Sequence, residues 1–175
     1  MRVERTSTRI APPRRADRAV AGRCGQAYLS RMAFVSITRL RLRALRFLPL
    51  FALDALRTTA QLRRADGYLT GAILRDRALT FWTMTVWRDA ADMRRYITDG
   101  SHLKAMPKLM HWCDEASIAH WTTETANLPG WDEADRRMRG EGRPSKVRYP
   151  SAGHAALGYR PPRLTGAAPI PPRRG

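Results

Sequence analysis

Residues 81–87 place large apolar side chains on both faces of a predicted strand. The run Phe81-Trp82-Thr83-Met84-Thr85-Val86-Trp87 is rich in aromatic and β-branched residues, which favour extended backbone. Side chains alternate between the two faces of a strand, so each face of this one carries apolar groups. Such a strand needs a sheet that is covered on both sides, by helices on one face and by a second layer on the other.

Strand and helix patterns alternate on both sides of this run. Asp89, with Asp92 three positions later, predicts a helix N-cap, and Gly100 predicts the end of that helix. Another helix is predicted with Phe51 and Leu56 among its inward residues and Asp54 on its outer face. The predicted strands are 33–42, 68–74, 78–87 and 115–122, and the helices are 48–64 and 90–98, followed by a short turn at Ser101 and a helical piece from Pro107 to Trp112.

This order predicts an α+β fold of the ferredoxin-like type, βαββαβ, with an antiparallel four-stranded sheet. Helices cover only one face of such a sheet. We expect a second copy to cover the other face by packing sheet to sheet, because a two-fold interface needs only one self-complementary surface. The expected assembly is a homodimer that forms a dimeric α/β barrel.

The two ends of the chain differ in composition from the centre. The N-terminal residues mix Arg, Pro, Ser and Thr without apolar periodicity, and the C-terminal residues are rich in Pro and Arg. The expected parts are a disordered extension over 1–31, the ferredoxin-like domain over 32–122, a C-terminal helix (Trp131 to Met138) and extended arm packed on it over 123–150, and a disordered tail over 151–175. Two alternatives for 1–31 are upstream sequence, with Met32 as the true start, and a mitochondrial-type transit peptide.

The net charge of +17 at first suggests a nucleic acid or an anionic membrane as partner. Its distribution argues against this, because the surplus is +6 in 1–31, +6 in 32–122 and +5 in 123–175. The arginines at the end of the first strand predict a solvated strand end, with phosphate binding as the alternative. These arginines are Arg39, Arg41, Arg43 and Arg46. We therefore expect no nucleic-acid partner.

Two cysteines, Cys24 and Cys113, are too few for a disulfide framework and fit a reducing cytoplasm. The apolar run 47–53 follows basic residues, as in a signal peptide, but Asp54 interrupts it and it is too short to cross a bilayer. We expect a cytoplasmic protein with no membrane partner.

His111, Cys113 and His120 lack a fourth ligand nearby, so no metal site is predicted.

One segment resembles a known family. Residues 81–93 end a strand in Trp87, an acidic cap at Asp89 and a helix, and residues 100–106 open the next turn with His102. This pattern is similar to the dimeric α/β-barrel superfamily of antibiotic-biosynthesis monooxygenase-like proteins. The resemblance implies a monooxygenase-like protein without a cofactor. Haem at His102 is the alternative, because haem-degrading members ligate iron through a helix His, but their Asn near the first strand is absent here.

The candidate functional residues are one histidine and a set of aromatic and hydroxyl side chains. His102 follows Ser101 at a predicted helix start, where the helix dipole favours neutral imidazole, so it is the candidate catalytic base. The aromatic surface exceeds what a core of this size needs and predicts a pocket for a planar ligand. The predicted pocket residues are Trp82, Trp87, Phe34, Ser36, Tyr68, Met84 and Trp112.

These features lead to two functional hypotheses. In the first, the protein binds a small apolar or aromatic molecule in a Trp-lined pocket and oxygenates it, with His102 removing a proton so that the substrate anion reduces oxygen. In the second, a dimeric module of the same fold binds the ligand without turnover. Loss of oxygen consumption in a His102→Ala variant would favour the first.

Overall fold

The computed structural model describes residues 32–173, and the predictions for residues 1–31 lie outside this part. The elements in chain order are β1 (Ala33–Leu42), η1 (Leu45–Phe47), α2 (Leu48–Leu62), β2 (Tyr68–Arg75), β3 (Thr80–Trp87), α3 (Ala90–Ile97), α4 (Gly100–Trp112), β4 (Cys113–Thr123), α5 (Trp131–Glu141), β5 (Arg143–Pro144) and β6 (Ala167–Pro169). The order from β1 to β4 is the predicted βαββαβ plan.

The sheet is antiparallel and has the strand order β5-β4-β1-β3-β2-β6. The four central strands are those predicted from the sequence. The prediction of four strands in total was wrong, because the short strands β5 and β6 extend the two edges. Neither has the length or apolar alternation that predicts a strand.

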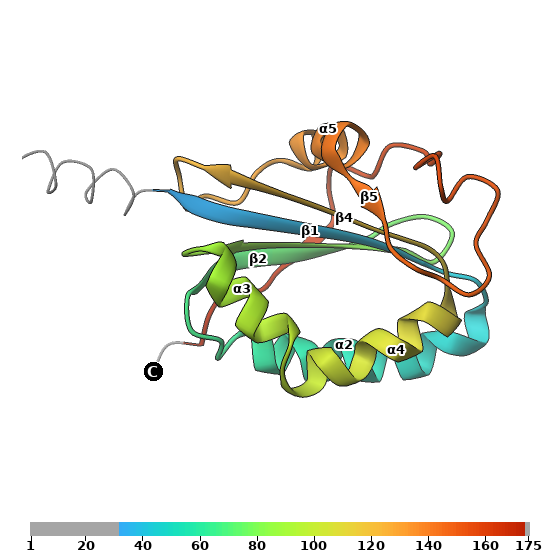
Figure 1. Ribbon diagram of the computed structural model, residues 1–175, viewed down its shortest axis with the longest axis horizontal. Helices are drawn as coiled ribbons and strands as arrows, with labels where there is room; N and C mark the ends of the chain where they lie inside the picture. Colours follow the sequence, from blue (N-terminus) through green and yellow to red (C-terminus); the bar gives the residue numbers. More distant parts are fainter. Residues whose placement is uncertain (1–31, 174–175) are drawn as a thin grey trace, which may run out of the picture. The chain divides into compact units, whose positions relative to one another are not determined.

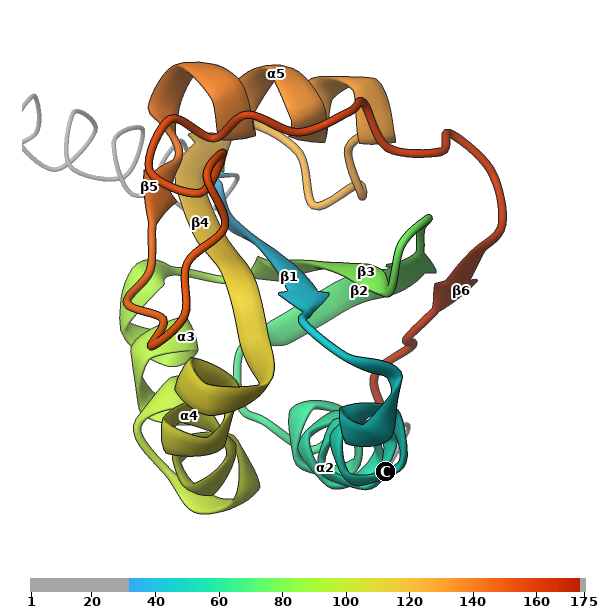
Figure 2. The same ribbon diagram turned by 90° about the vertical axis from the view of Figure 1, so that its right-hand side faces the viewer.

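The two faces of the sheet pack against different parts of the chain. Figures 1 and 2 show α5 on one side of the sheet and α2, α3 and α4 on the other. Ile37 and Met84 belong to the core that contains Trp131 and Met138 of α5. A second core joins residues of the strands and helices on the opposite side: Leu62, Tyr68, Trp87, Met93 and Ile170.

α5 is the second layer that the run 81–87 requires. Its Trp131, Ala134 and Met138 are buried, at 8%, 0% and 0% exposure, in the core shared with the sheet. A second copy of the chain was expected to cover this face. The chain itself supplies that cover, so the expectation loses its physical reason.

α2 presents a different face to the domain than its sequence pattern predicts. Asp54 is buried and its carboxylate accepts a hydrogen bond of 2.8 Å from the Lys108 ammonium of α4, whereas Leu56 is 70% exposed. α2 lies beside α4, and Lys108 neutralises the inward carboxylate. A local hydrophobic pattern cannot anticipate a partner that lies on another helix.

α4 is one continuous helix, so the predicted break before Pro107 was wrong. Pro107 lies inside α4 and cannot donate a hydrogen bond to the carbonyl of Leu103. Both residues are exposed, which leaves that carbonyl accessible to water and limits the cost.

The C-terminal segment differs from the expected disordered tail. β6 pairs with β2, and Ile170 is buried at 4% exposure. The Tyr68 hydroxyl donates to the Ile170 carbonyl at 2.6 Å, and the Ile170 amide donates to the Gly71 carbonyl at 2.7 Å. One apolar side chain and an open strand edge order a segment whose composition alone indicates disorder.

Within residues 32–173, no helix has the length and apolarity needed to cross a membrane.

Candidate functional site

Four aromatic rings form a continuous row on the helix side of the sheet. The ring centroids of Tyr68 and Trp87 are 5.4 Å apart, those of Trp87 and Tyr96 5.3 Å, and those of Tyr96 and His102 4.8 Å. β2, β3, α3 and α4 each contribute one ring. The Tyr96 hydroxyl donates to the Thr58 carbonyl of α2 at 3.2 Å, so the row is also bonded to α2. We call these four residues the aromatic row.

Hydrogen bonds hold the inner end of the aromatic row. The Trp87 indole donates to the Thr85 hydroxyl at 2.9 Å, and that hydroxyl donates to the Ser36 carbonyl at 3.3 Å. The Tyr68 hydroxyl donates to Ile170, and burial raises the pKa of Tyr68. Both ring orientations are therefore set by the protein before any ligand arrives, a requirement for a selective site.

His102 stands at the outer end of the row, in the first turn of α4. Its amide donates to the Gln61 side-chain oxygen at 2.9 Å, and its Nδ1 lies 3.3 Å from the Ile97 carbonyl. Burial lowers the pKa of His102, so the neutral ring is favoured. Because a carbonyl oxygen can only accept, a neutral His102 that bonds it carries its proton on Nδ1 and has a basic Nε2.

A groove of about 580 Å³ lies between α2 and the corner where α3 meets α4. Tyr96 forms part of its wall, so the groove reaches the aromatic row. Gln61 crosses the base of the corner by donating to the carbonyls of Tyr96 and Asp99. The lining residues are Arg57, Ala60, Gln61, Arg64, Ala65, Asp66, Asp92, Arg95, Tyr96, Asp99 and Ser101.

The structure brings together only part of the predicted pocket. Four of the predicted residues lie on the helix side. Tyr68 and Trp87 belong to the second core, Phe34 packs against it, and the Ser36 carbonyl accepts the hydrogen bond from Thr85. Trp82 and Met84 lie on the α5 side, because they alternate with the polar Thr83 and Thr85 along β3. Trp112 lies elsewhere, stacked on Phe47 at 6.3 Å. His102 joins the row but does not line the groove.

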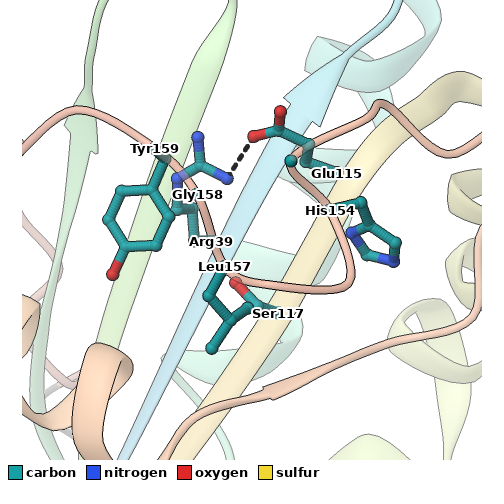
Figure 3. Close-up of a pocket in the computed structure, with 8 residues that line it drawn as sticks. Arg39, Glu115, Ser117, His154, Leu157, Gly158 and Tyr159 are labelled. Atoms are coloured by element: carbon teal, nitrogen blue, oxygen red, sulfur yellow. Dashed lines mark ion pairs between the residues drawn. The ribbon is translucent and has the colours of Figure 1, made fainter.

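Trp82 belongs to a second, closed cluster around Arg39 on the α5 side. The Arg39 guanidinium lies 4.3 Å from the Tyr159 ring and 5.7 Å from the Trp82 ring. It also pairs with Glu115 at 2.6 Å, and Figure 3 shows the chain around Gly158 passing over this pair. The space between these side chains is too small for a water molecule. This cluster attaches the C-terminal segment to the sheet and offers no room for a ligand.

Three of the four arginines near the end of β1 make ion pairs or hydrogen bonds, and the fourth, Arg46, lies 4.9 Å from the Phe47 ring. Arg39 pairs with Glu115, and Arg41 makes two bonds to Asp114 at 2.9 and 2.8 Å. The Arg43 side chain donates to the His111 carbonyl at 2.8 Å. These guanidinium groups already have partners, so the structure gives little support to the alternative of phosphate binding at this strand.

The described residues contain no group of three metal-ligating side chains close enough to hold an ion. Cys113 is buried, and burial raises the pKa of its thiol to about 12, which disfavours the thiolate a metal requires. Haem does not fit His102 in this arrangement. The imidazole packs against Tyr96 and is absent from the groove wall, so a haem in the groove would lack that ligand.

Sequence reasoning missed Tyr96 and Gln61. Tyr96 follows Trp87 and precedes His102 in the family-like segment, and its place on the predicted helix shared with Met93 is a signal that could have found it. Gln61 gave no such signal. Its role depends on α2 and α4 lying side by side, which local sequence does not encode.

Comparison with known families gives a match over residues 57–142 to a domain of unknown function, DUF3291. The matched residues include the last turns of α2, the aromatic row and α5, and make up just under half of the chain. No curated protein matches the chain.

Several solved structures are similar to the chain. A conserved protein from Methanosarcina mazei Go1 has 12% identity and a TM-score of 0.48, covering 54% of this chain and 96% of its own. SnoaB, a cofactor-independent oxygenase from Streptomyces nogalater, has 19% identity and a TM-score of 0.42, covering 52% and 90%. A candidate antibiotic biosynthesis monooxygenase from Nitrosomonas europaea has 14% identity and a TM-score of 0.46, covering 54% and 91%.

Residues 81–106 resemble a family whose members have a βαββαβ plan. The βαββαβ order of the structure shows the same plan independently. The resemblance to the antibiotic biosynthesis monooxygenase-like proteins is one of fold and rests on this βαββαβ order, and residues 57–142 match DUF3291.

Proposed function

We propose that the protein binds a small apolar or aromatic molecule at the aromatic row, which it enters through the groove. The observation that carries the proposal is the position of Tyr96. Its side chain lines the groove, and its ring contacts both Trp87 and His102. The groove volume of about 580 Å³ is in the range typical of small-molecule sites.

The proposal does not require a second copy of the chain. All residues of the groove and the row come from one chain, and α5 covers the opposite face of the sheet. A homodimer would leave this site as it is unless its interface included α2 or α3.

A pair of tryptophan variants tests the binding site. We expect Trp87→Phe to weaken the binding of 2-naphthol, because Trp87 supports Tyr96 on the inner side of the row. Trp82→Phe is the matched control, since Trp82 is equally buried but lies on the α5 side. Isothermal titration calorimetry measures both affinities. Equal losses in the two variants, or no binding by the wild-type protein, would contradict the proposal.

Oxygenation of the ligand is a second candidate function, supported by the state of His102. A half-buried neutral imidazole with Nδ1 at a carbonyl suits a general base. In this function, Nε2 removes a proton from a hydroxyl of the substrate, and a carbon of the anion that forms bonds to one atom of O2. The second oxygen atom leaves as water, so the substrate supplies all four electrons that reduce O2. Binding must then move Tyr96 enough to bring the substrate to His102.

Oxygen consumption with hydroquinone tests this step. We expect His102→Gln to abolish consumption above the uncatalysed rate, whereas His154→Gln retains it. His154 is the control because its Nε2 contacts the Ser145 carbonyl, away from the aromatic row. The wild-type rate should fall as the pH drops through the lowered pKa of His102, since the protonated ring cannot accept a proton. If the wild-type protein consumes no oxygen, the oxygenation function is excluded and binding without turnover is the function that remains.

A further inference from the structure

The groove has two walls of different electrostatic character. On the α3 wall, Arg88 pairs with Asp92 at 2.7 Å and with Asp66 at 3.1 Å, and Arg95 pairs with the same two carboxylates. Asp92 is almost fully buried, and these guanidinium groups neutralise it. The two positive and two negative charges balance, so this wall has no preference for a charged ligand.

The α2 wall carries net positive charge, because the single Asp54 carboxylate is shared between Arg57 and Lys108. Arg57 belongs to α2, and Arg64 lies in the turn that follows the end of α2 at Leu62; both line the groove. The nearest carboxylate to Arg57 is that of Asp54 at 3.8 Å, a distance too long for a hydrogen bond. The Arg64 side chain has no ion pair or hydrogen bond within residues 32–173. Ala60 lies between them and leaves the space in front of the helix open.

The remaining acid of the groove sits on the facing corner. Asp99 precedes α4, and its side chain makes neither an ion pair nor a capping hydrogen bond within the described part of the chain. A ligand with two or three negative charges would meet repulsion from this carboxylate. A ligand with one negative charge can keep it at the α2 wall and turn its uncharged part toward Tyr96.

We propose that the ligand of this groove is an aromatic monocarboxylate. Its carboxylate binds Arg57 and Arg64, and its ring lies over Ala60 and Ala65 against Tyr96. Guanidinium groups suit this role because their donors match the two oxygens of a carboxylate. The inference rests on the proposed function, since it names the class of ligand for the same groove and aromatic row.

Two probes of equal shape and different charge test the inference: 2-naphthoate and the neutral 2-naphthalenemethanol. Calorimetry should show that the wild-type protein binds the acid more tightly. We expect each of Arg57→Gln and Arg64→Gln to lower the affinity for the acid by up to about fivefold, the range for exposed ion pairs. The double variant should bind acid and alcohol equally and unfold at the wild-type temperature, since both arginines are exposed.

Arg94→Gln is the matched control. Arg94 is an exposed residue of α3 that does not line the groove, and its replacement removes the same charge. It should keep the preference for the acid. An equal loss in Arg94→Gln would show that net charge rather than the groove recognises the acid, and would overturn the inference.

The remaining outcomes separate the inference from the proposed function. If the alcohol binds, depends on Trp87 and equals the acid in affinity, the class of ligand is wrong and the proposed function stands. If neither probe binds, both are overturned. Tighter acid binding that weakens with added salt and with both groove variants supports both.

Discussion

Arg39 and Glu115 are charges that the protein buries on the α5 side of the sheet. Their side chains are 7% and 5% exposed, and the Ser151 hydroxyl donates to the Glu115 carboxylate at 2.7 Å. Arg41 also pairs with Glu115, at 2.8 Å. Removing one partner of such a group leaves an uncompensated buried charge, which costs more than the ion pair contributes.

We therefore expect Glu115→Gln to lower the free energy of unfolding by about 3 kcal/mol or more. Asp114→Asn is the comparison, because Asp114 is 21% exposed and its loss leaves Arg41 close to water. That change should cost about 1 kcal/mol or less. Urea unfolding measures both, and similar values for the two variants would contradict the account of the buried cluster.

His102 makes stability depend on pH. The folded protein lowers its pKa below the ordinary 6.5, so between the two values the unfolded chain binds a proton that the folded chain does not. The contribution of the neutral ring is complete above pH 6.5 and is lost as the pH falls toward the folded pKa. The loss between pH 7.5 and 5.5 should be smaller in His102→Gln than in the wild-type protein.

Urea unfolding at the two pH values gives this difference for each protein, so any constant cost of the substitution cancels. His120 has a lowered pKa for the same main reason, burial, and contributes in the same direction. His102→Gln should therefore remove only part of the pH dependence. An unchanged dependence would show that His102 is not buried as described.

β6 is a three-residue strand, and its stability comes from what surrounds it. The backbone of residues 167–169 pairs with β2, and Ile170 fills the second core beside Tyr68. This is an element that composition assigns to a disordered tail. Pro169 ends β6, an edge strand in which a missing backbone donor is tolerated, and Pro171 and Pro172 follow the strand.

Ile170→Ala tests whether β6 is part of the fold. We expect it to lower the free energy of unfolding by about 2–4 kcal/mol, as for other large buried side chains reduced to alanine. Leu164→Ala is the matched control, because Leu164 lies in the same segment but is 65% exposed. Its effect should stay within about 0.5 kcal/mol. Denaturant unfolding that shows equal small effects would mean that the segment does not pack on the sheet.

At the scale of the whole molecule, one chain covers both faces of its own sheet. α5 and Tyr159 pack on one side, whereas α2, α3 and α4 lie on the other, where Ile170 at the end of the C-terminal segment joins the second core (Figure 2). We expect sedimentation equilibrium to give the mass of one chain, 19.9 kDa. A dimer mass would require an interface elsewhere. The outer side of α2, with Leu53 and Leu56 exposed, would then be the first surface to mutate.

The sequence alone determined the order and nature of the central elements. Strand alternation in residues 81–87 and the Asp89 cap are local signals, and the Asp89 carboxylate does accept the Asp92 amide at 2.8 Å. The need for two covering layers also follows from the sequence, because apolar groups on both faces of a strand are visible in its residue order.

Only the tertiary structure decided which residues meet. Strand alternation puts Trp82 and Trp87 on opposite faces of β3, but only the tertiary structure shows that Trp82 meets α5 and that Trp87 meets Tyr96 and the helices. The cover of the second face, the inward Asp54 and the groove beside Tyr96 depend on contacts between segments distant in sequence. Local pattern reports what a residue prefers, whereas packing of the whole chain sets what it touches, because burial is shared among distant parts.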